Sequence, residues 1–206
     1  MKVLFLGPDD SPLLAWLHSA EEQVVSTTHR IDVAFVRACA PEFVVVYGYR
    51  HILTEDVLGV CANRVVNLHV SYLPWNRGAD PNLWSFVEDT PKGVTIHYVD
   101  SGIDTGDVIA QQRMSFSDAE TLRTSYDKLQ VEAQTLFRIN WSEIRTGTCR
   151  RQPQTATGTY HRLKDKAALS HILTDGWDTP VSTLVEYGRI SDLWKHQANP
   201  GSIHGD

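Results

Sequence analysis

The chain has few cysteines and lacks any long apolar stretch. Its 206 residues include only three cysteines, Cys39, Cys61 and Cys149, and no two of them are spaced as Cys-x-x-Cys. This pattern supports neither a disulfide framework nor a zinc cluster, so we expect no metal site and a reducing, cytoplasmic location. The apolar run KVLFLG near the N-terminus is interrupted at once by Pro8 and two aspartates. We therefore expect no signal peptide, no spanning helix and no membrane partner.

Positive charge is also scarce. Nineteen lysines and arginines stand against 25 acidic residues, which gives a net charge of -6, and no basic run is present. A nucleic-acid-binding surface needs a cluster of cations to neutralise phosphates. We therefore expect no nucleic-acid partner, and a large RNA substrate is disfavoured. A chain of this length is expected to form one globular domain with a modest extension.

The first part of the chain alternates strands and helices. Short apolar runs predict strands at residues 1–7, 24–27 and 43–47, and helices begin between them at Ser11 and at Asp32. The strands are apolar throughout rather than alternating, which is typical of a parallel sheet covered on both faces. The predicted fold class is α/β, a Rossmann-like and mostly parallel sheet with helices on both faces.

The later part continues this pattern and then changes in composition. Strands are expected at residues 64–69, 94–99 and 108–116, with a short helix at 83–87. A long helix from Asp118 to Gly147 is indicated by apolar residues that recur every three or four positions. Residues 1–147 are thus predicted to be the catalytic domain. Residues 148–206 are more polar and too short for a core of their own, so we expect a small appendage, a β-hairpin and a short helix at residues 164–174, that serves dimerisation or covers substrate.

A polar pair lies at the end of one predicted strand. Asn67 and His69 are two positions apart, so their side chains point to the same side of the strand. In open parallel sheets, ligands bind beyond the carboxyl ends of the strands, which is where both residues are expected. This placement favours a site over a structural role.

The loop at residues 101–107 supplies the third candidate. Its two glycines and its acidic residues suit a loop that approaches a ligand, and Asp104 is the natural catalytic carboxylate. A carboxylate beside His69 favours the imidazolium, so the pair can hold or pass a proton. The amide of Asn67 can donate a hydrogen bond to a developing oxyanion. Together these groups suit acyl transfer to an amine.

These residues lie in a set of motifs, NLHVSYLP at 67–74, Arg77-Gly78, GVTIH at 93–97 and IDTGDVI at 103–109. Over residues 1–145 the chain resembles the N10-formyltetrahydrofolate-dependent formyltransferase family. The resemblance implies a Rossmann-like fold, N10-formyltetrahydrofolate as co-substrate, no metal, and Asn67, His69 and Asp104 as the catalytic residues. It also implies that folate lies between residues 49–54 and the loop at 100–104, with contacts from Tyr49, His51, Ile52, Leu53 and Asp100.

The segment WNRGADPNLWSF at residues 75–86 resembles the subgroup that formylates amino sugars carried on nucleotides. This resemblance implies an acceptor such as dTDP-4-amino-4,6-dideoxyglucose, a role in cell-surface polysaccharide synthesis such as lipopolysaccharide O-antigen, and a homodimer. We expect substrate contacts from Trp75, Arg77, Asp80 and Asn82. A diphosphate needs a cation, which Arg77 would supply.

Other functions stay open from the residues alone. The acceptor could be another small amine, such as a ribonucleotide amine. The chain could instead hydrolyse formyltetrahydrofolate, or it could be a folate- or nucleotide-binding module that has lost catalysis. His97 lies inside a predicted strand. It is interpreted as a core histidine, or as a residue that supports the catalytic residues without contacting the substrate.

Overall fold

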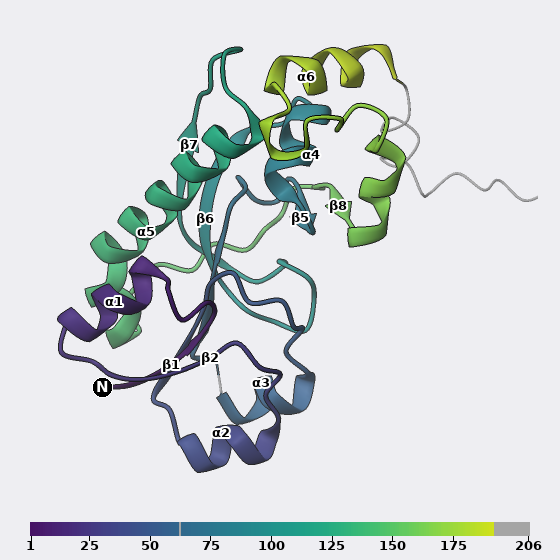
Figure 1. Cartoon of the computed structure of the whole chain (residues 1–206). Coiled ribbons are helices and arrows are strands. Elements are labelled where there is room, and N and C mark those ends of the chain that lie inside the picture. Colours follow the sequence, from purple (N-terminus) through teal and green to yellow (C-terminus); the bar gives the residue numbers. More distant parts are fainter. Residues whose placement is uncertain (62, 192–206) are drawn as a thin grey trace, which may run out of the picture.

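The computed structural model describes residues 1–61 and 63–191 of the chain (Figure 1). A six-stranded sheet with the strand order β2-β1-β3-β4-β6-β7 forms its centre. The strands are β1 (Lys2–Leu6), β2 (Gln23–Thr27), β3 (Phe43–Val46), β4 (Val65–His69), β6 (Lys92–Tyr98) and β7 (Val108–Met114). The main helices are α1 (Pro12–Ser19), α2 (Val33–Cys39), α3 (Glu55–Cys61), α4 (Pro81–Val87) and α5 (Leu122–Thr146).

The first four strands of the sheet run parallel, as the sequence predicts, because a helix connects each of β1, β2 and β3 to the next strand in the chain. The helix starts are confirmed by their caps. The side chain of Ser11 accepts a hydrogen bond from the backbone N–H of Leu13, and that of Asp32 accepts one from Phe35 at 2.8 Å. These caps satisfy backbone donors that have no partner within the helix.

Helices cover both faces of the sheet. One core lies between the sheet and α1 and α5, and it includes Leu17, Phe137 and Ile144. The opposite core lies between the sheet and α2 and α3, and it includes Val36 and Val57. Figure 1 shows α1 and α5 together on one side of the strands. The predicted fold class is therefore confirmed.

The direction of the sheet changes after β4. β6 pairs antiparallel with β4, and β7 pairs antiparallel with β6. The long helix α5 begins at its N-cap Thr121 and ends at Gly147, whose φ of 70° is the left-handed conformation that glycine adopts at low cost. The end of this helix at Gly147 is confirmed. The helix α3 was not expected from the sequence, because it is short and contains Gly59.

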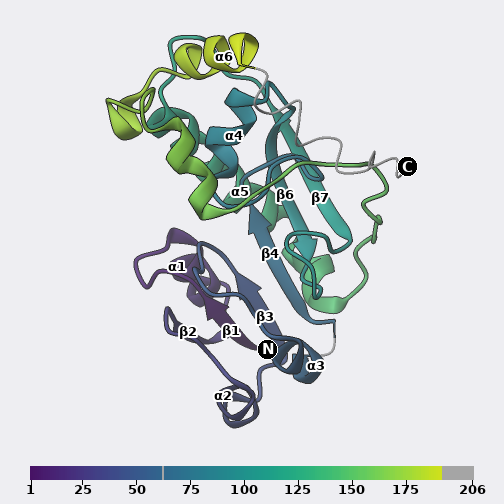
Figure 2. The same cartoon turned by 90° about the vertical axis from the view of Figure 1, so that its right-hand side faces the viewer.

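The chain after α5 differs from the expected hairpin. Strand β8 (Tyr160–His161) pairs parallel with β5 (Arg77–Gly78) rather than with a neighbour in its own segment. Two 3-10 helices, η1 (Leu163–Leu169) and η2 (Gly176–Asp178), and α6 (Val181–Ile190) follow. Figure 2 shows this segment beside α4.

The appendage shares a core with the rest of the chain. Leu169 of η1 and Val181 and Leu184 of α6 pack with Leu83 and Val87 of α4. The final part of the predicted appendage, residues 192–206, lies outside the described residues.

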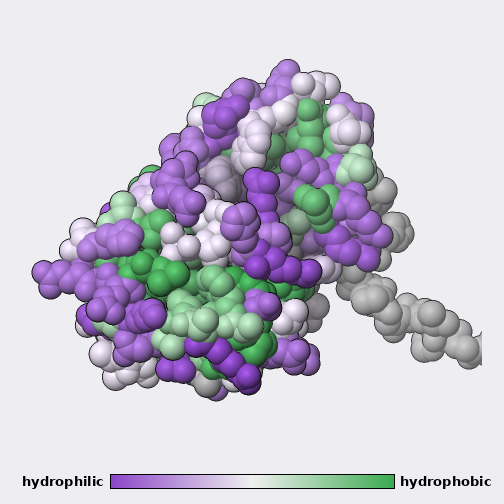
Figure 3. Space-filling view, turned by 60° about the horizontal axis from the view of Figure 1, so that its bottom comes forward, coloured by the Kyte–Doolittle hydropathy of each residue, from purple (hydrophilic) through white to green (hydrophobic). Residues whose placement is uncertain are grey.

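On the face shown in Figure 3, an area of hydrophobic residues is bordered by hydrophilic ones. Among the described residues, no helix combines the length and the hydropathy needed to cross a lipid bilayer.

Candidate active site

Strands β4 and β6 place the first polar residues of the site. Asn67 and His69 are on the same side of β4, and the antiparallel register sets Asn67 opposite His97 of β6. Nδ2 of Asn67 lies 3.2 Å from Nε2 of His97. His69 is buried, with 7% of its surface exposed. The expectation that Asn67 and His69 share a side of the strand is confirmed.

The loop between β6 and β7 contains Asp104 and directs its carboxylate toward the site. Its shape is held by Asp100, whose Oδ1 accepts hydrogen bonds from the backbone N–H of Gly102 at 3.1 Å and from Oγ1 of Thr105 at 2.6 Å. A side chain at Gly106 would place a Cβ 1.9 Å from the carbonyl oxygen of Tyr98, so only glycine fits there. Asp104 itself has a φ of 53°. The loop therefore holds the carboxylate in one direction.

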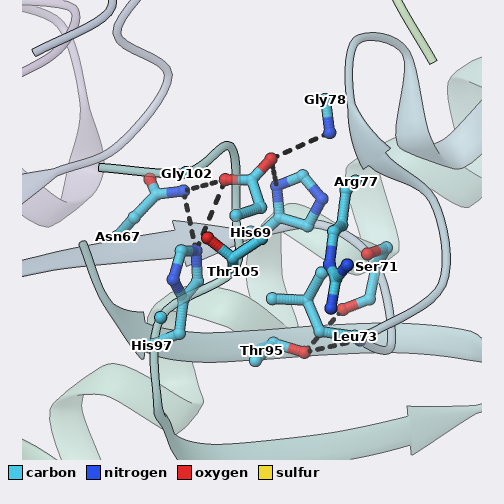
Figure 4. Close-up of polar contacts among 12 residues, drawn as sticks. Asn67, His69, Ser71, Leu73, Arg77, Gly78, Thr95, His97, Gly102 and Thr105 are labelled. Atoms are coloured by element: carbon cyan, nitrogen blue, oxygen red, sulfur yellow. Dashed lines mark hydrogen bonds and ion pairs between the residues drawn. The ribbon is translucent and has the colours of Figure 1, made fainter. Parts of the chain in front are cut away.

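The side chains of Asn67, His69 and His97 point toward one another (Figure 4), and the carboxylate of Asp104 contacts all three. Its Oδ2 is 3.6 Å from Nδ1 of His69, and its Oδ1 is 3.3 Å from Nδ2 of Asn67 and 3.5 Å from Nε2 of His97. The backbone N–H of Gly78 donates to Oδ2 at 2.9 Å. The structure thus brings together the amide, imidazole and carboxylate that the sequence singles out.

The surroundings of Asp104 favour its ionised form. Burial raises the pKa of the carboxyl, but the charge of His69, the hydrogen bond and charge of His97 and the N–H of Gly78 outweigh it. The net effect holds the pKa of Asp104 well below its usual range. The site therefore keeps a carboxylate beside two imidazoles at neutral pH.

His97 is both a core histidine and a support for the predicted catalytic residues, the two interpretations that the sequence offers. It is 1% exposed, as expected for a core histidine, but its ring lies against both Asn67 and Asp104. Nδ1 of His97 lies 2.8 Å from the carbonyl oxygen of Tyr98, which can only accept, so this nitrogen carries the hydrogen. The signals in the sequence are the alternation that sets His97 and Thr95 on one side of β6 and the place of His97 in the GVTIH motif.

The residues expected to hold folate form two groups. Tyr49 and Leu53 pack against the core under α2 and α3, and the hydroxyl of Tyr49 donates to the carbonyl of His29 at 2.7 Å. His51 and Ile52 are exposed, with Ile52 68% accessible. The first group anchors the loop, and the second is available to a ligand.

The residues expected to contact the acceptor also differ in their surroundings. The guanidinium of Arg77 donates to Oε1 of Gln154 at 2.8 Å, while Trp75 is half-buried. Asn82 is buried, and its amide joins α4 to α5 by donating to the carbonyl of Leu122 at 3.0 Å. Asp80 lies 3.0 Å from Nζ of Lys166 through Oδ1, while its Oδ2 is buried with no hydrogen-bond partner among the described residues.

A cavity of about 680 Å³ opens beside this segment. Its walls come from the start of α4, the start of α5 and the appendage. Asp80 and Lys166 supply its charges, and Tyr126 and Trp177, whose ring centroids lie 5.2 Å apart, supply its aromatic surface. Its volume falls in the range of pockets that bind small organic ligands, about 300 to 1,000 Å³. The lining also includes Val70, which directly follows His69 in the chain.

The described residues contain no group of three or more His, Cys, Asp and Glu side chains that could hold a metal ion. The groups that are present can donate hydrogen bonds to an oxyanion and exchange protons. These are the requirements of acyl transfer between two bound molecules.

Comparison with known proteins identifies relatives over most of the chain. Residues 18–138 match the family model described as formyl transferase. The chain is 33% identical over 192 residues to the methionyl-tRNA formyltransferase of Acetivibrio thermocellus, a match that covers 83% of this chain and 62% of that protein. It is also 33% identical over 126 residues to the methionyl-tRNA formyltransferase of Thermodesulfovibrio yellowstonii, covering 61% of this chain and 41% of that protein. The chain thus spans less than two thirds of the length of these curated relatives.

Two solved structures match a larger share of this chain and of their own length. The formyltransferase PseJ from Anoxybacillus kamchatkensis, in complex with UDP-4,6-dideoxy-4-formamido-L-AltNAc and tetrahydrofolate, superposes with a TM-score of 0.87 at 46% identity. That match covers 91% of this chain and 100% of PseJ. A 4-N formyltransferase from Francisella tularensis has a TM-score of 0.76 at 20% identity, over 90% of this chain and 86% of that one. At this lower identity the likeness shows the fold alone.

Proposed function

Because this chain belongs to the formyl transferase family, we propose that it transfers a formyl group from N10-formyltetrahydrofolate to the amine of a nucleotide-linked amino sugar. One observation carries the proposal. Asp104 lies 3.3 Å from Asn67 and 3.6 Å from His69, and a ligand-sized cavity is lined by Val70 and Asp80, which lie close to His69 and Gly78 in the chain. The roles of these residues are part of the proposal.

In the proposed reaction the lone pair of the amine attacks the formyl carbon. The formyl oxygen becomes an oxyanion, which takes a hydrogen bond from Nδ2 of Asn67. The amine nitrogen loses its proton to the Asp104 and His69 pair. A proton returns from this pair to N10 as the bond between N10 and the formyl carbon breaks, which leaves tetrahydrofolate and the formamide.

The orientation of His69 supports this role. Its Nε2 lies 3.0 Å from the carbonyl oxygen of Asn76, which can only accept, so Nε2 carries a hydrogen. Nδ1 is left to face Asp104. Proton exchange in the proposed mechanism therefore takes place at Nδ1, on the side of the carboxylate.

The proposed acceptor occupies the cavity beside Asp80. The base of a nucleotide would lie against Tyr126 and Trp177, since aromatic rings offer flat apolar faces for stacking. Lys166, or Arg77 as expected from the sequence, would supply the cation for the diphosphate. The pterin would lie near His51 and Ile52, which are exposed.

The identity of the sugar nucleotide is a finer proposal. The sequence of residues 75–86 favours dTDP-4-amino-4,6-dideoxyglucose as the acceptor. The product bound to PseJ is a UDP-linked 4-formamido-4,6-dideoxy sugar. Both have a nitrogen at C4 of a 4,6-dideoxyhexose. We propose such a 4-amino-4,6-dideoxy sugar as the acceptor, and a role in cell-surface polysaccharide synthesis follows from it.

The division of the chain is proposed in the same way. Residues 1–147 would be the catalytic domain and residues 148–206 the appendage, of which η1 and η2 would cover the acceptor. The homodimer and the cytoplasmic location stay predictions. Light scattering of the purified chain tests the first of these.

The test is a panel of acceptors incubated with N10-formyltetrahydrofolate. The panel contains dTDP- and UDP-linked 4-amino-4,6-dideoxy sugars, the corresponding 3-amino sugars and a ribonucleotide amine. Mass spectrometry should show one formyl group replacing a hydrogen on a 4-amino sugar nucleotide, with an equal amount of tetrahydrofolate formed. Formate released equally fast without any acceptor would instead identify a hydrolase.

A second candidate acceptor is methionyl-tRNA, because it is the substrate in the names of the curated relatives. The net charge of -6 opposes this reading, since a tRNA-binding surface needs clustered cations. Methionyl-tRNA should therefore gain no formyl group in the same assay.

A further inference from the structure

One peptide unit joins the proposed catalytic histidine to the appendage. The carbonyl oxygen of Asn76 lies 3.0 Å from Nε2 of His69, and the N–H of the same peptide unit, which belongs to Arg77, donates to the carbonyl of Thr159 at 2.9 Å. The peptide is thus held from both sides. The direction of the Asn76 carbonyl decides which nitrogen of His69 carries the hydrogen.

The side chain of Asn76 is fully engaged. It is 0% exposed, its Nδ2 donates to Oε2 of Glu88 at 2.8 Å, and its Oδ1 accepts from Thr90 at 2.8 Å. Its backbone N–H donates to Oγ1 of Thr159 at 3.0 Å. Its φ of 59° lies in the left-handed region, which these contacts hold in place. The carbonyl that faces His69 therefore depends on this network.

Glu88 is the centre of the network. Its side chain is 5% exposed and accepts hydrogen bonds from Asn76, from Oγ1 of Thr159 at 2.7 Å and from Nε2 of His161 at 2.7 Å. All three partners donate, so the site requires a group that only accepts. A glutamine would turn its amide nitrogen toward one of these donors. The ring of Trp84 stacks on the ring of His161, with the two centroids 3.8 Å apart, and so holds His161 in place.

The segments that contain Asn76 and Thr159 also orient Asp104. Gly78, which donates to Oδ2 of Asp104, lies in β5, and β5 is paired with β8 of the appendage. Gln154, just before β8, donates to the carbonyls of Asp104 and Gly106 at 2.9 and 2.8 Å. The appendage thus contacts the segment behind His69 and the loop behind Asp104.

We infer that Glu88 and Thr159 are positioning residues, which hold the Asn76 carbonyl so that His69 keeps its hydrogen on Nε2 and presents Nδ1 to Asp104. Neither residue touches the reacting atoms. The inference rests on the proposed function for its catalytic consequence, but the state of the His69 ring can be measured without any substrate.

The first measurement is the tautomer of His69 by ¹⁵N NMR of the imidazole nitrogens in the free full-length chain. The signal is assigned by its loss in His69→Gln. We expect a hydrogen on Nε2 in the wild type, and a shift toward the Nδ1-protonated form in Glu88→Gln and in Thr159→Val. Thr159→Ser keeps the hydroxyl and should keep the wild-type signal. An unchanged His69 signal in folded Glu88→Gln and Thr159→Val would overturn the inference.

The second measurement is the kinetics of formyl transfer. Glu88→Gln and Thr159→Val should lower kcat by at least about tenfold, because small displacements of a catalytic group are costly. The KM for N10-formyltetrahydrofolate should stay within about twofold, and Thr159→Ser should restore kcat. Loss of kcat in proportion to the unfolded fraction, or equal loss in Thr159→Ser, would mean a merely structural role.

Glu22→Gln is the matched control for a buried carboxylate. Glu22 is 6% exposed and accepts from Nε1 of Trp141 at 3.1 Å, away from the site. It should lower the melting temperature but leave kcat and the His69 signal unchanged. If the wild type transfers no formyl group to any acceptor, the proposed function fails, and the NMR arm still decides the inference.

Discussion

Asn67 lies opposite His97 across the β4 and β6 pair, with Nδ2 of the amide 3.2 Å from Nε2 of the imidazole. Because Nδ1 of His97 donates to the carbonyl of Tyr98, Nε2 accepts from Asn67 when the ring is neutral and donates toward Asp104 when the ring is protonated. The contact therefore fixes the amide of Asn67 with its nitrogen toward His97 and Asp104. With the neutral ring both amide hydrogens have partners, so the formyl oxygen must replace one of them.

This relationship predicts the effect of His97→Phe. The variant keeps a ring in the buried space but removes the acceptor for Asn67. Loss of a buried hydrogen-bond partner costs about 1 to 3 kcal/mol, so kcat should fall by about fivefold or more while the fold is retained. Steady-state kinetics and a melting curve check this. A kcat equal to that of the wild type would show that the orientation of Asn67 does not depend on His97.

The amide of Asn67 is predicted to stabilise the oxyanion. Asn67→Ala should lower kcat by about 10² to 10³, the usual loss when one oxyanion donor is removed, with little change in the KM for either substrate. The control is Asn140→Ala on α5, whose amide donates to the carbonyl of Leu136 outside the site. A rise in KM at constant kcat would assign Asn67 to binding instead.

The low pKa of Asp104 predicts how stability depends on pH. A carboxyl whose pKa is lowered in the folded state stabilises the fold above its usual pKa of about 3.9, and this contribution is lost as the pH falls below that value. The free energy of unfolding should therefore fall with acidification more steeply in the wild type than in Asp104→Asn. Urea unfolding between pH 7 and pH 3 measures both slopes. Equal slopes would contradict the lowered pKa.

The cavity predicts a separate effect on the acceptor. Trp177 is 46% exposed, so Trp177→Ala should leave the fold intact while it removes a stacking surface. Loss of base stacking costs about 1 to 3 kcal/mol, so the KM for the sugar nucleotide should rise by about fivefold or more. The KM for N10-formyltetrahydrofolate should not change.

Ile139→Ala is the control for this change, because Ile139 is an exposed apolar residue on α5, 75% accessible. It should alter neither KM. An equal rise in the KM for folate in Trp177→Ala would place the folate, rather than the acceptor, in the cavity.

Most of the sheet could be predicted from local patterns. The apolar runs, the caps at Ser11 and Asp32 and the period of α5 depend on residues a few positions apart, which the sequence displays directly. Two short helices, α3 and α6, were not anticipated. Short helices have weak periodic signals and are stabilised mainly by packing, here for α6 against α4.

The sequence by itself determined which groups carry the proposed chemistry, since a spacing of two on a strand puts Asn67 and His69 on one side, and the motif around Asp104 marks its loop. Only the tertiary structure decided how these groups are oriented. His97, Glu88 and Thr159 act on them through pairings between distant segments, β4 with β6 and β5 with β8. Such pairings have no local periodicity, because a hydrogen bond depends on where two segments meet in space rather than on the residues beside each partner.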